Sequence, residues 1–337
     1  MPKLKNCLTQ HIVNMDALSL MAIEHPTVDS CSPRHRNHAL VKKILVVSGT
    51  YAAYSTVLPL LPIPAIFQGR VAEIALLILT TSLFMLLQLF MDLQFAYADL
   101  SVRAALSGVG ISGLIWGGAY FALERPHFVQ LMHVLQMAPN EWYIPNYILH
   151  QAMMMCLTLV CIFGGCMLSH IVRERNILLP VALAAIPIDY LGAMTKFGFT
   201  SNVVKSNPAL LYAVTVPVPV ARGLLVHGIQ PAAIVGPGDV LFMTFFLCAV
   251  NRLRMNTVKT YWYVYLGVAV SMLCVVLLPN FNIAALIPIG IAVIIANYKY
   301  LTLKRSEVFA TLYAVGFVLV LVLCFYLYTN HYVFGRK

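Results

Sequence analysis

Two aspartates lie inside apolar stretches of this 337-residue sequence, where a charged side chain is unexpected. Asp239 follows the tripeptide Gly236-Pro237-Gly238 and begins a long apolar run, and Asp189 lies in an earlier apolar run. An aspartate in the hydrocarbon core of a bilayer costs roughly 2.5–3.5 kcal/mol on insertion scales, so an acid at that depth is a candidate functional residue. Two carboxyl groups in a low-dielectric site do not both ionise easily and would share one proton. The ionised member could then act as a general base and the protonated member as a general acid, without a metal.

The composition is that of a membrane protein. Hydrophobic residues make up 61% of the chain and charged residues 10%, whereas about a quarter of the residues of a soluble domain are charged. We therefore predict a multi-pass helical protein whose main partner is the lipid bilayer. The formal net charge of +10 would suggest a nucleic-acid partner for a soluble protein. Here most lysines and arginines lie between apolar runs, as the positive-inside rule expects, so we predict no nucleic-acid binding.

Charge-free intervals predict an all-α polytopic fold with about nine transmembrane helices, since about 20 apolar helical residues cross a bilayer. The expected spans are residues 43–70, 71–91, 104–123, 147–170, 177–195, 231–250, 261–278, 283–298 and 308–328. The last long interval is divided by Pro279-Asn280-Phe281-Asn282. We predict two parts, a polar N-terminal arm at residues 1–42 and a single membrane domain at residues 43–337.

Three local patterns refine this picture. Residues 124–145 suit an amphipathic segment at the membrane interface. In the third span, Gly113-xxx-Gly117 predicts a close approach of two helix backbones. The proline-punctuated stretch Val214–Val220 between the two aspartates favours extended backbone rather than helix.

The distribution of basic residues predicts the orientation. The side of the N-terminal arm collects fifteen lysines and arginines and the opposite side seven. The N terminus is therefore expected in the cytoplasm and the C terminus outside. In this orientation the long connection between the two aspartate-bearing spans faces outside.

The two aspartates are expected at similar depth. Asp189 follows the start of its span by twelve residues and Asp239 precedes the end of its span by eleven, which corresponds to roughly 18 and 16 Å, near the middle of the bilayer. Of the twelve acidic residues, we expect only these two to lie well inside spans. Gly236-Pro237-Gly238 should loosen the helix beside Asp239 and admit water and an extended substrate.

Neither a metal nor a cofactor is predicted. The eight cysteines lie mostly inside apolar runs, and they lack the spacing to each other and to histidines that a metal site requires. We interpret them as packing residues.

A family resemblance rests on these residues. Gly236-x-Gly238-Asp239, followed by Val240-Leu241-Phe242, resembles the GxGD signature of the presenilin and signal peptide peptidase family of intramembrane aspartyl proteases. In that family a second aspartate, usually preceded by tyrosine, lies on the preceding helix, and Asp189 corresponds to it here. A Pro-Ala-Leu motif opens the second helix after GxGD, and Ala284-Ala285-Leu286 holds the corresponding place.

The resemblance covers about residues 177–298 and implies a presenilin-like catalytic core. It implies a protease that cleaves transmembrane segments of proteins or signal-peptide remnants, so that the substrate partner is a transmembrane peptide or protein. Asp189 and Asp239 would be catalytic. The supporting residues would be Tyr190, Gly236, Gly238, Ala284, Ala285 and Leu286.

The sequence departs from the family pattern at three places. Ile188 precedes the first aspartate and Tyr190 follows it, Ala284 replaces the first proline, and a literal Pro208-Ala209-Leu210 lies between the aspartates. The number of helices around the core also differs from that of the family.

Three other functions fit the same residues. A prepilin-peptidase-like protease also uses GxGD, although its aspartates lie near the cytoplasmic face. A proton-coupled transporter could use Asp189 and Asp239 as a relay, with the broken helix at Gly236–Gly238 as an ion site. A structural protein descended from a protease could retain the aspartates for helix pairing.

Overall fold

The computed structural model describes residues 33–62, 69–123, 143–190, 215–219, 234–277, 284–301 and 305–334. The chain divides into two compact units, residues 1–39 and 40–337. Four regions named above lie outside the described residues: most of the polar arm (1–32), most of the interfacial segment (124–142), Pro208-Ala209-Leu210 and Pro279–Asn282.

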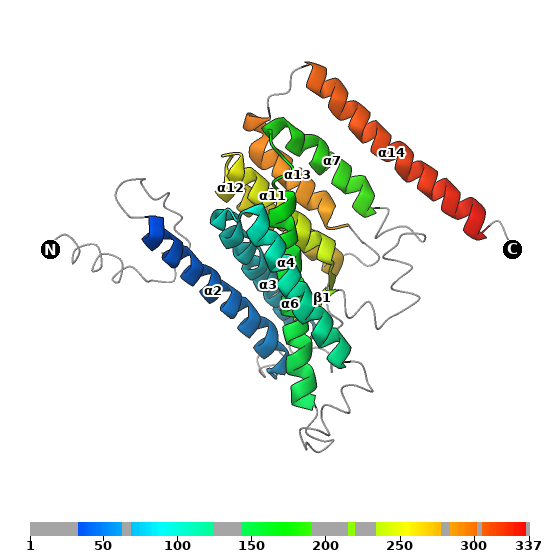
Figure 1. The fold of residues 1–337 in the computed structure, drawn as a ribbon. Helices are drawn as coiled ribbons and strands as arrows, with labels where there is room; N and C mark the ends of the chain where they lie inside the picture. Colours follow the sequence, from blue (N-terminus) through cyan, green and yellow to red (C-terminus); the bar gives the residue numbers. More distant parts are fainter. Residues whose placement is uncertain are drawn as a thin grey trace, which may run out of the picture. The chain divides into compact units, whose positions relative to one another are not determined.

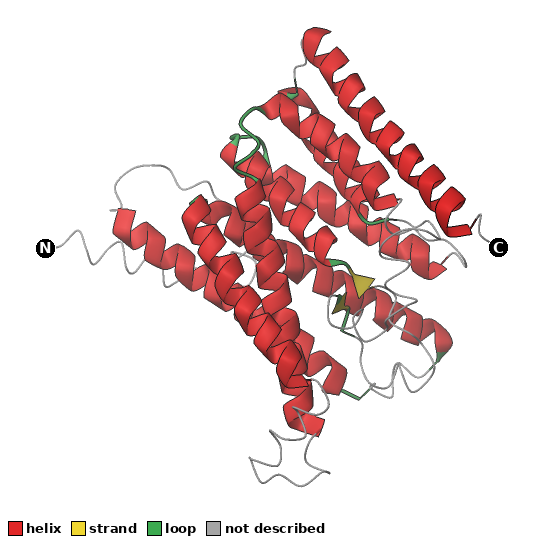
Figure 2. Ribbon diagram, turned by 45° about the vertical axis from the view of Figure 1, so that its right-hand side comes forward, coloured by secondary structure: helices red, strands yellow, loops and turns green. Residues whose placement is uncertain are grey.

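Helices make up almost all of the described chain (Figures 1 and 2). The α-helices within it are α2 (Pro33–Val57), α3 (Arg70–Ala98), α4 (Val102–Leu123), α6 (Tyr143–Leu168), α7 (Leu178–Asp189), α11 (Pro237–Arg252), α12 (Thr257–Leu277), α13 (Leu286–Asn297) and α14 (Arg305–Phe334). Short 3-10 turns are η1 (Leu58–Leu60), η4 (Arg175–Ile177) and η6 (Tyr298–Tyr300). Two two-residue strands, β1 (Val216–Pro217) and β2 (Ile234–Val235), pair antiparallel, with Val216 opposite Val235.

Four of these helices are long and apolar enough to cross a membrane. They comprise Arg70–Ala98, Val102–Leu123, Pro145–Leu168 and Thr257–Val275, which lie in α3, α4, α6 and α12. The chain is therefore a helical protein with the character of a membrane protein. A described helix overlaps each of the nine predicted spans, but the number of membrane crossings stays a prediction.

The predicted boundaries are wrong at three helices. Helix α2 begins at Pro33, inside the predicted polar arm, and ends at Val57. Helix α3 continues to Ala98, seven residues past the predicted end, because a single buried acid does not end a helix. Helix α11 begins at Pro237 rather than at 231, since Ile234 and Val235 are in strand β2.

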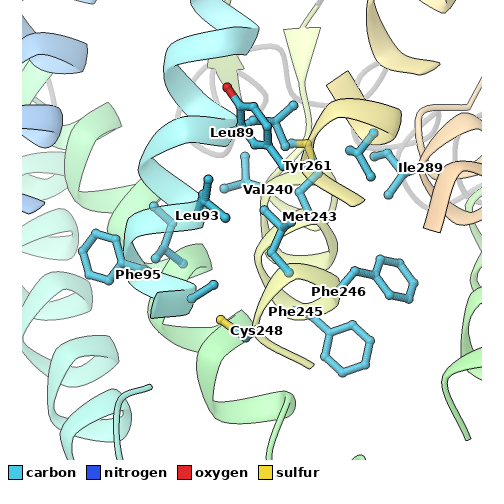
Figure 3. Close-up of a cluster of buried hydrophobic side chains, with 14 of the residues drawn as sticks. Leu89, Leu93, Phe95, Val240, Met243, Phe245, Phe246, Cys248, Tyr261 and Ile289 are labelled. Carbon is cyan, nitrogen blue, oxygen red and sulfur yellow. The ribbon is translucent and has the colours of Figure 1, made fainter. Parts of the chain in front are cut away.

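Helix α11 is the central element of the core. Every residue from Met243 to Val250 is buried, which is expected of a helix covered on all sides. It contacts α3, α6, α12 and α13. Figure 3 shows Leu89 and Leu93 of α3 beside Val240 and Met243 of α11. The start of this central helix carries Asp239.

A glycine allows α6 to approach α11 closely. A β-carbon at Gly165 would lie 2.6 Å from the carbonyl oxygen of Leu241 and 2.8 Å from the backbone nitrogen of Phe245. Such distances exclude any side chain, because the atoms that would be hit belong to the backbone. The contact fixes the turn of α11 that follows Asp239.

The close helix contact predicted at Gly113 and Gly117 is absent there among the described residues, and a close contact of α4 is found at Gly108 instead. A β-carbon at Gly113 would come no nearer than 3.9 Å to Val160, and one at Gly117 would meet nothing within 4 Å. At Gly108 it would lie 2.6 Å from the ring of Phe163 on α6. The helices therefore pack closely at Gly108, where a large ring needs the space, and the GxxxG pattern does not mark a backbone contact in the described structure.

A second set of helices carries Asp189. Helix α13 packs between α12 and α7, and α14 packs against α7. Glycines make these contacts close, since a β-carbon at Gly290 would lie 3.2 Å from the Ala182 carbonyl and one at Gly267 3.2 Å from the Pro288 carbonyl. Through α13, the helix that bears Asp189 is held in register with the core.

The end of α11 away from Asp239 is held by polar contacts. Arg252 Nη2 lies 3.3 Å from Asp99 Oδ1 and 2.6 Å from His170 Nε2. Asn251 Nδ2 donates to the Ala96 carbonyl at 2.8 Å. Because these groups lie at or beyond the ends of α3 and α6, they fix α11 against both helices.

Replacing Gly165 by alanine tests the packing of α11. We expect Gly165→Ala to lower the free energy of unfolding by at least about 1–3 kcal/mol, because backbone atoms must move to admit the methyl group. Gly164→Ala is the matched control, since its β-carbon would meet only Leu241 Cδ1, at 3.4 Å. Chemical denaturation of the purified protein in detergent, followed by circular dichroism, measures both. Equal stability of the two variants would contradict the close contact.

Candidate active site

Asp239 lies at the start of a helix. It is the third residue of α11, and its Oδ2 accepts a hydrogen bond from the backbone N–H of Gly236 at 3.0 Å. Pro237 opens the helix with its fixed φ angle, and an acid in the first turn is favoured by the helix dipole. The side chain is partly buried. Helix capping alone would explain an acid at this position, so its function depends on what lies opposite.

Asp189 lies against the start of another helix. It is the last residue of α7, and its Oδ2 accepts a hydrogen bond from the backbone N–H of Leu286, the first residue of α13, at 2.9 Å. The first N–H groups of a helix have no partner within the helix and carry partial positive charge. Two helix N-termini, of α11 and α13, therefore each bind one of the two carboxyl groups.

The charge of Asp189 disfavours the ionised form of Asp239, in addition to the effect of burial. Each uses Oδ2 for the backbone donor, which leaves Oδ1 available for water, substrate or a shared proton. Among the described residues no lysine or arginine pairs with either aspartate. Two interacting acids without a side-chain cation meet a general condition for sharing one proton.

The match in bilayer depth stays a prediction, and Asp239 lies at a helix start rather than within a helix. Asp189 ends the 12-residue α7, and Asp239 is third in the 16-residue α11. At about 1.5 Å per residue these positions lie roughly 17 and 20 Å from the Leu178 and Arg252 ends of the two helices. The two acids therefore lie at similar distances along their helices from those ends.

The glycines of the signature have different surroundings. Gly236 is the N-cap of α11 and donates the hydrogen bond to Asp239. A β-carbon there would lie 3.2 Å from Asp239 Oδ2. Gly238 is exposed, and a β-carbon would meet nothing within 4 Å. Of the two, Gly236 directly shapes the position of the carboxyl group.

The remaining predicted residues flank Asp189 to different degrees. Ala284 is buried, Ala285 is partly buried against the core, and Leu286 supplies the backbone donor. Tyr190 adjoins Asp189 in sequence, but its side chain is 51% exposed. The structure therefore brings the Ala284-Ala285-Leu286 segment to Asp189, and does not show a contact of the Tyr190 hydroxyl with either carboxyl group.

Extended backbone leads directly into the site. Strand β2 ends at Val235, the residue before Gly236, and pairs with Val216 and Pro217. This confirms extended structure within the predicted stretch Val214–Val220, of which residues 215–219 are described. The side chains of Val216, Val218 and Val235 are buried, so the strand pair is anchored in the core next to Asp239.

Asp92 is a fully buried acid that the apolar-run pattern did not place inside a helix. It lies on α3 with no exposed side-chain surface, and Gln88 Nε2 donates to its Oδ1 at 3.1 Å. The predicted span ended at residue 91 because the acid was taken as its boundary. The apolar run that continues through Phe95 and Ala96, both buried, is the signal that could have placed Asp92 inside the helix.

Comparison of this chain with protein-family models, with curated proteins and with solved structures finds no match. Within the described part of the chain, no three histidine, cysteine, aspartate or glutamate side chains gather as a metal site would require.

A double-mutant cycle tests whether the two carboxyl groups interact. We expect the effects of Asp189→Asn and Asp239→Asn on the free energy of unfolding to differ from additivity by at least about 0.5 kcal/mol, because each acid changes the energy of the other. Denaturation of the wild type, both single variants and the double variant in detergent gives this coupling.

The control cycle combines Asp239→Asn with Asp99→Asn. The Asp99 side chain is 62% exposed and pairs with Arg252 at the opposite end of α11, so these two effects should add. Additivity in both cycles would mean that Asp189 and Asp239 do not interact.

Proposed function

We propose that this protein is an intramembrane aspartyl protease that cleaves transmembrane segments, with Asp189 and Asp239 as the catalytic pair. The observation that carries the proposal is the pairing itself. Two partly buried carboxyl groups from α7 and α11 interact electrostatically, and each is oriented by a backbone N–H at a helix start. Helix capping needs no second acid, whereas acid–base hydrolysis needs both.

The chemistry requires one proton shared by the pair. The ionised aspartate accepts a proton from a water molecule, whose oxygen attacks the carbonyl carbon of the scissile peptide. The protonated aspartate donates to the carbonyl oxygen, which gives a tetrahedral intermediate. When the C–N bond breaks, the aspartate that took the proton from water gives it to the leaving nitrogen. The other aspartate accepts a proton from a hydroxyl of the intermediate, so the pair regains its starting state. The backbone donors on Oδ2 hold both groups in place throughout.

The backbone before Asp239 suits an extended substrate. A helical peptide hides its carbonyl carbons from attack, so the cleaved segment must unfold locally. The β1–β2 pair ends directly before Gly236, and an extended segment could add to it by backbone hydrogen bonds. Such pairing would satisfy the polar backbone of the unfolded segment inside the membrane.

The distribution of basic residues supports the membrane orientation that goes with this proposal. The N terminus would lie in the cytoplasm and the C terminus outside, with the α7–α11 connection outside. Substrate segments that run from an inside N terminus to an outside C terminus would then enter the site. Fusing a topology reporter after Lys205, which lies outside the described residues, tests this, and a cytoplasmic reporter would contradict it.

Loss of either catalytic carboxyl group should abolish cleavage. We expect Asp189→Asn and Asp239→Asn each to reduce turnover of a transmembrane reporter peptide by at least about 10²–10⁴-fold, the usual contribution of general acid–base catalysis. Purified protein in bilayer nanodiscs and mass spectrometry of the products provide the measurement, and Asp99→Asn is the matched control.

The two aspartate variants also distinguish the proposed protease from the alternative functions. Cleavage that survives in both aspartate variants would contradict the two-aspartate mechanism. Proton-coupled flux into proteoliposomes that both variants lose, without any proteolysis, would identify a transporter instead. Products cut only at the membrane face of the reporter would indicate a prepilin-peptidase-like enzyme.

The two signature glycines should respond differently to alanine. In Gly236→Ala the new methyl group would lie 3.2 Å from Asp239 Oδ2 and displace the carboxyl group, so we expect kcat to fall at least about tenfold. In Gly238→Ala the methyl group enters open space, and kcat should stay close to that of the wild type. Rates of reporter cleavage by the two variants, compared at equal folded fraction, decide this. A larger loss in Gly238→Ala would show that Gly236 does not set the position of Asp239.

A further inference from the structure

We propose that Asp92 is a proton-binding site, a neutral carboxylic acid sealed between α3, α6 and α11 that holds α11 in place through Thr244. The proposal is independent of the proposed function, because it concerns a residue outside the Asp189–Asp239 pair. Asp92, Gln88 and Thr244 are each at most 1% exposed.

One of the two carboxyl oxygens of Asp92 has no hydrogen-bond donor among the described residues. Gln88 donates to Asp92 Oδ1 at 3.1 Å, while Asp92 Oδ2 is buried without any partner. Thr244 lies beside the carboxyl group, but its hydroxyl donates to the Val240 carbonyl at 3.0 Å. With its proton directed to Val240, the Thr244 oxygen keeps a lone pair that can accept a further hydrogen bond. A buried carboxyl oxygen without a donor in a dry site requires a proton or a cation beside it.

The charges around Asp92 favour its protonated, neutral form over the ionised carboxylate. The titratable groups on which Asp92 acts are Tyr51 of α2, Cys161 of α6, Cys248 of α11 and Tyr261 of α12. Each of them is neutral or negative, so none can compensate an ionised carboxylate. The cation of α11, Arg252, is two helical turns beyond Thr244 and pairs with Asp99. An uncompensated buried charge is costly, whereas the protonated acid is neutral and supplies the missing donor.

The side-chain oxygens with free lone pairs that α3 and α11 present around Asp92 are fewer than a hard cation takes. Asp92 Oδ2, Gln88 Oε1 and the Thr244 hydroxyl are the nearby polar oxygens with free lone pairs on α3 and α11, and a hard cation takes six or more oxygen ligands. A proton needs only one donor atom and one acceptor, which Asp92 Oδ2 and Thr244 Oγ1 provide.

Protonated Asp92 would help to hold the part of α11 that carries Asp239. Thr244 follows Asp239 by five residues on α11, and Cys161 lies within the electrostatic reach of both Asp92 and Asp239. A hydrogen bond from Asp92 to Thr244 would fix the first turns of α11 against α3. Loss of the proton would place a second negative charge near the pair, which itself carries one, and break this contact, so Asp92 acts as a positioning residue.

Infrared spectroscopy of the full-length protein in nanodiscs at neutral pH tests the proposal. A protonated carboxyl group gives a carbonyl stretching band apart from the carboxylate bands, and we expect Asp92→Asn to remove one such component. Asp99→Asn, which changes an exposed acid, should leave the band unchanged. An unchanged band in Asp92→Asn would overturn the proposal.

Stability gives a second measurement. Asparagine is neutral and keeps a donor, so Asp92→Asn should melt close to the wild type, and Asp92→Ala should melt at a lower temperature. A variant Asp92→Asn that is as unstable as Asp92→Ala would count against a neutral acid. Melting in sodium chloride and in choline chloride should agree, and a sodium-specific shift that Asp92→Asn removes would identify a cation site instead.

Thr244 provides a test that does not change the acid. In Thr244→Val the acceptor is lost without a large change of shape, so the Asp92 carbonyl band should shift, whereas Thr244→Ser should keep its position. A band that is unaffected by Thr244→Val would overturn the contact between Asp92 and Thr244.

Discussion

The start of a helix is the feature on which the candidate site depends. Asp239 accepts a backbone hydrogen bond at the N-terminus of α11, and Asp189 accepts one at the N-terminus of α13. Free N–H groups and the positive end of the helix dipole stabilise an anion without any side-chain cation. Each of the two acids is therefore stabilised at a helix start with no described lysine or arginine paired to it.

The rest of the fold fixes where those helix starts point. Helix α11 is buried along most of its length, approaches α6 at Gly165, and is held at its far end by Arg252 and Asn251. Helix α13 is held between α12 and α7 at Gly267 and Gly290. Small residues serve this purpose inside a membrane, where the hydrophobic effect does not drive helices together and close packing must do so. The site thus lies on rigid elements, with an extended strand pair leading into it.

Exposure separates Asp189 and Asp239 from Asp92. Asp189 and Asp239 are partly buried, while Asp92 has no exposed surface. Hydrolysis needs a water molecule at the acid, so the partly exposed pair suits catalysis and the sealed acid does not. Asp92 is surrounded by Gln88, Thr244 and neutral titratable groups, and its natural state there is the neutral acid. The chain therefore places aspartate in two environments, one partly exposed and one fully buried.

The sequence by itself determined the helical membrane class, the identity of the two aspartates, the extended stretch between them and the segment around Leu286. These follow from composition, apolar run length and proline positions, which are local properties of the chain. Tertiary structure decided that Asp239 begins its helix rather than lying within it, because β2 pairs with β1 across a long connection.

Tertiary structure also decided that Asp92 is buried, since only the packing of α3 against α6 and α11 shows whether an acid next to an apolar run faces the core. It placed the close helix contact at Gly108 rather than at Gly113 and Gly117, because the shape of the facing Phe163 ring determines where a glycine is needed. The backbone donor from Leu286 to Asp189 joins residues 97 positions apart. No local pattern encodes such a contact, and it arises only when α7 and α13 pack together.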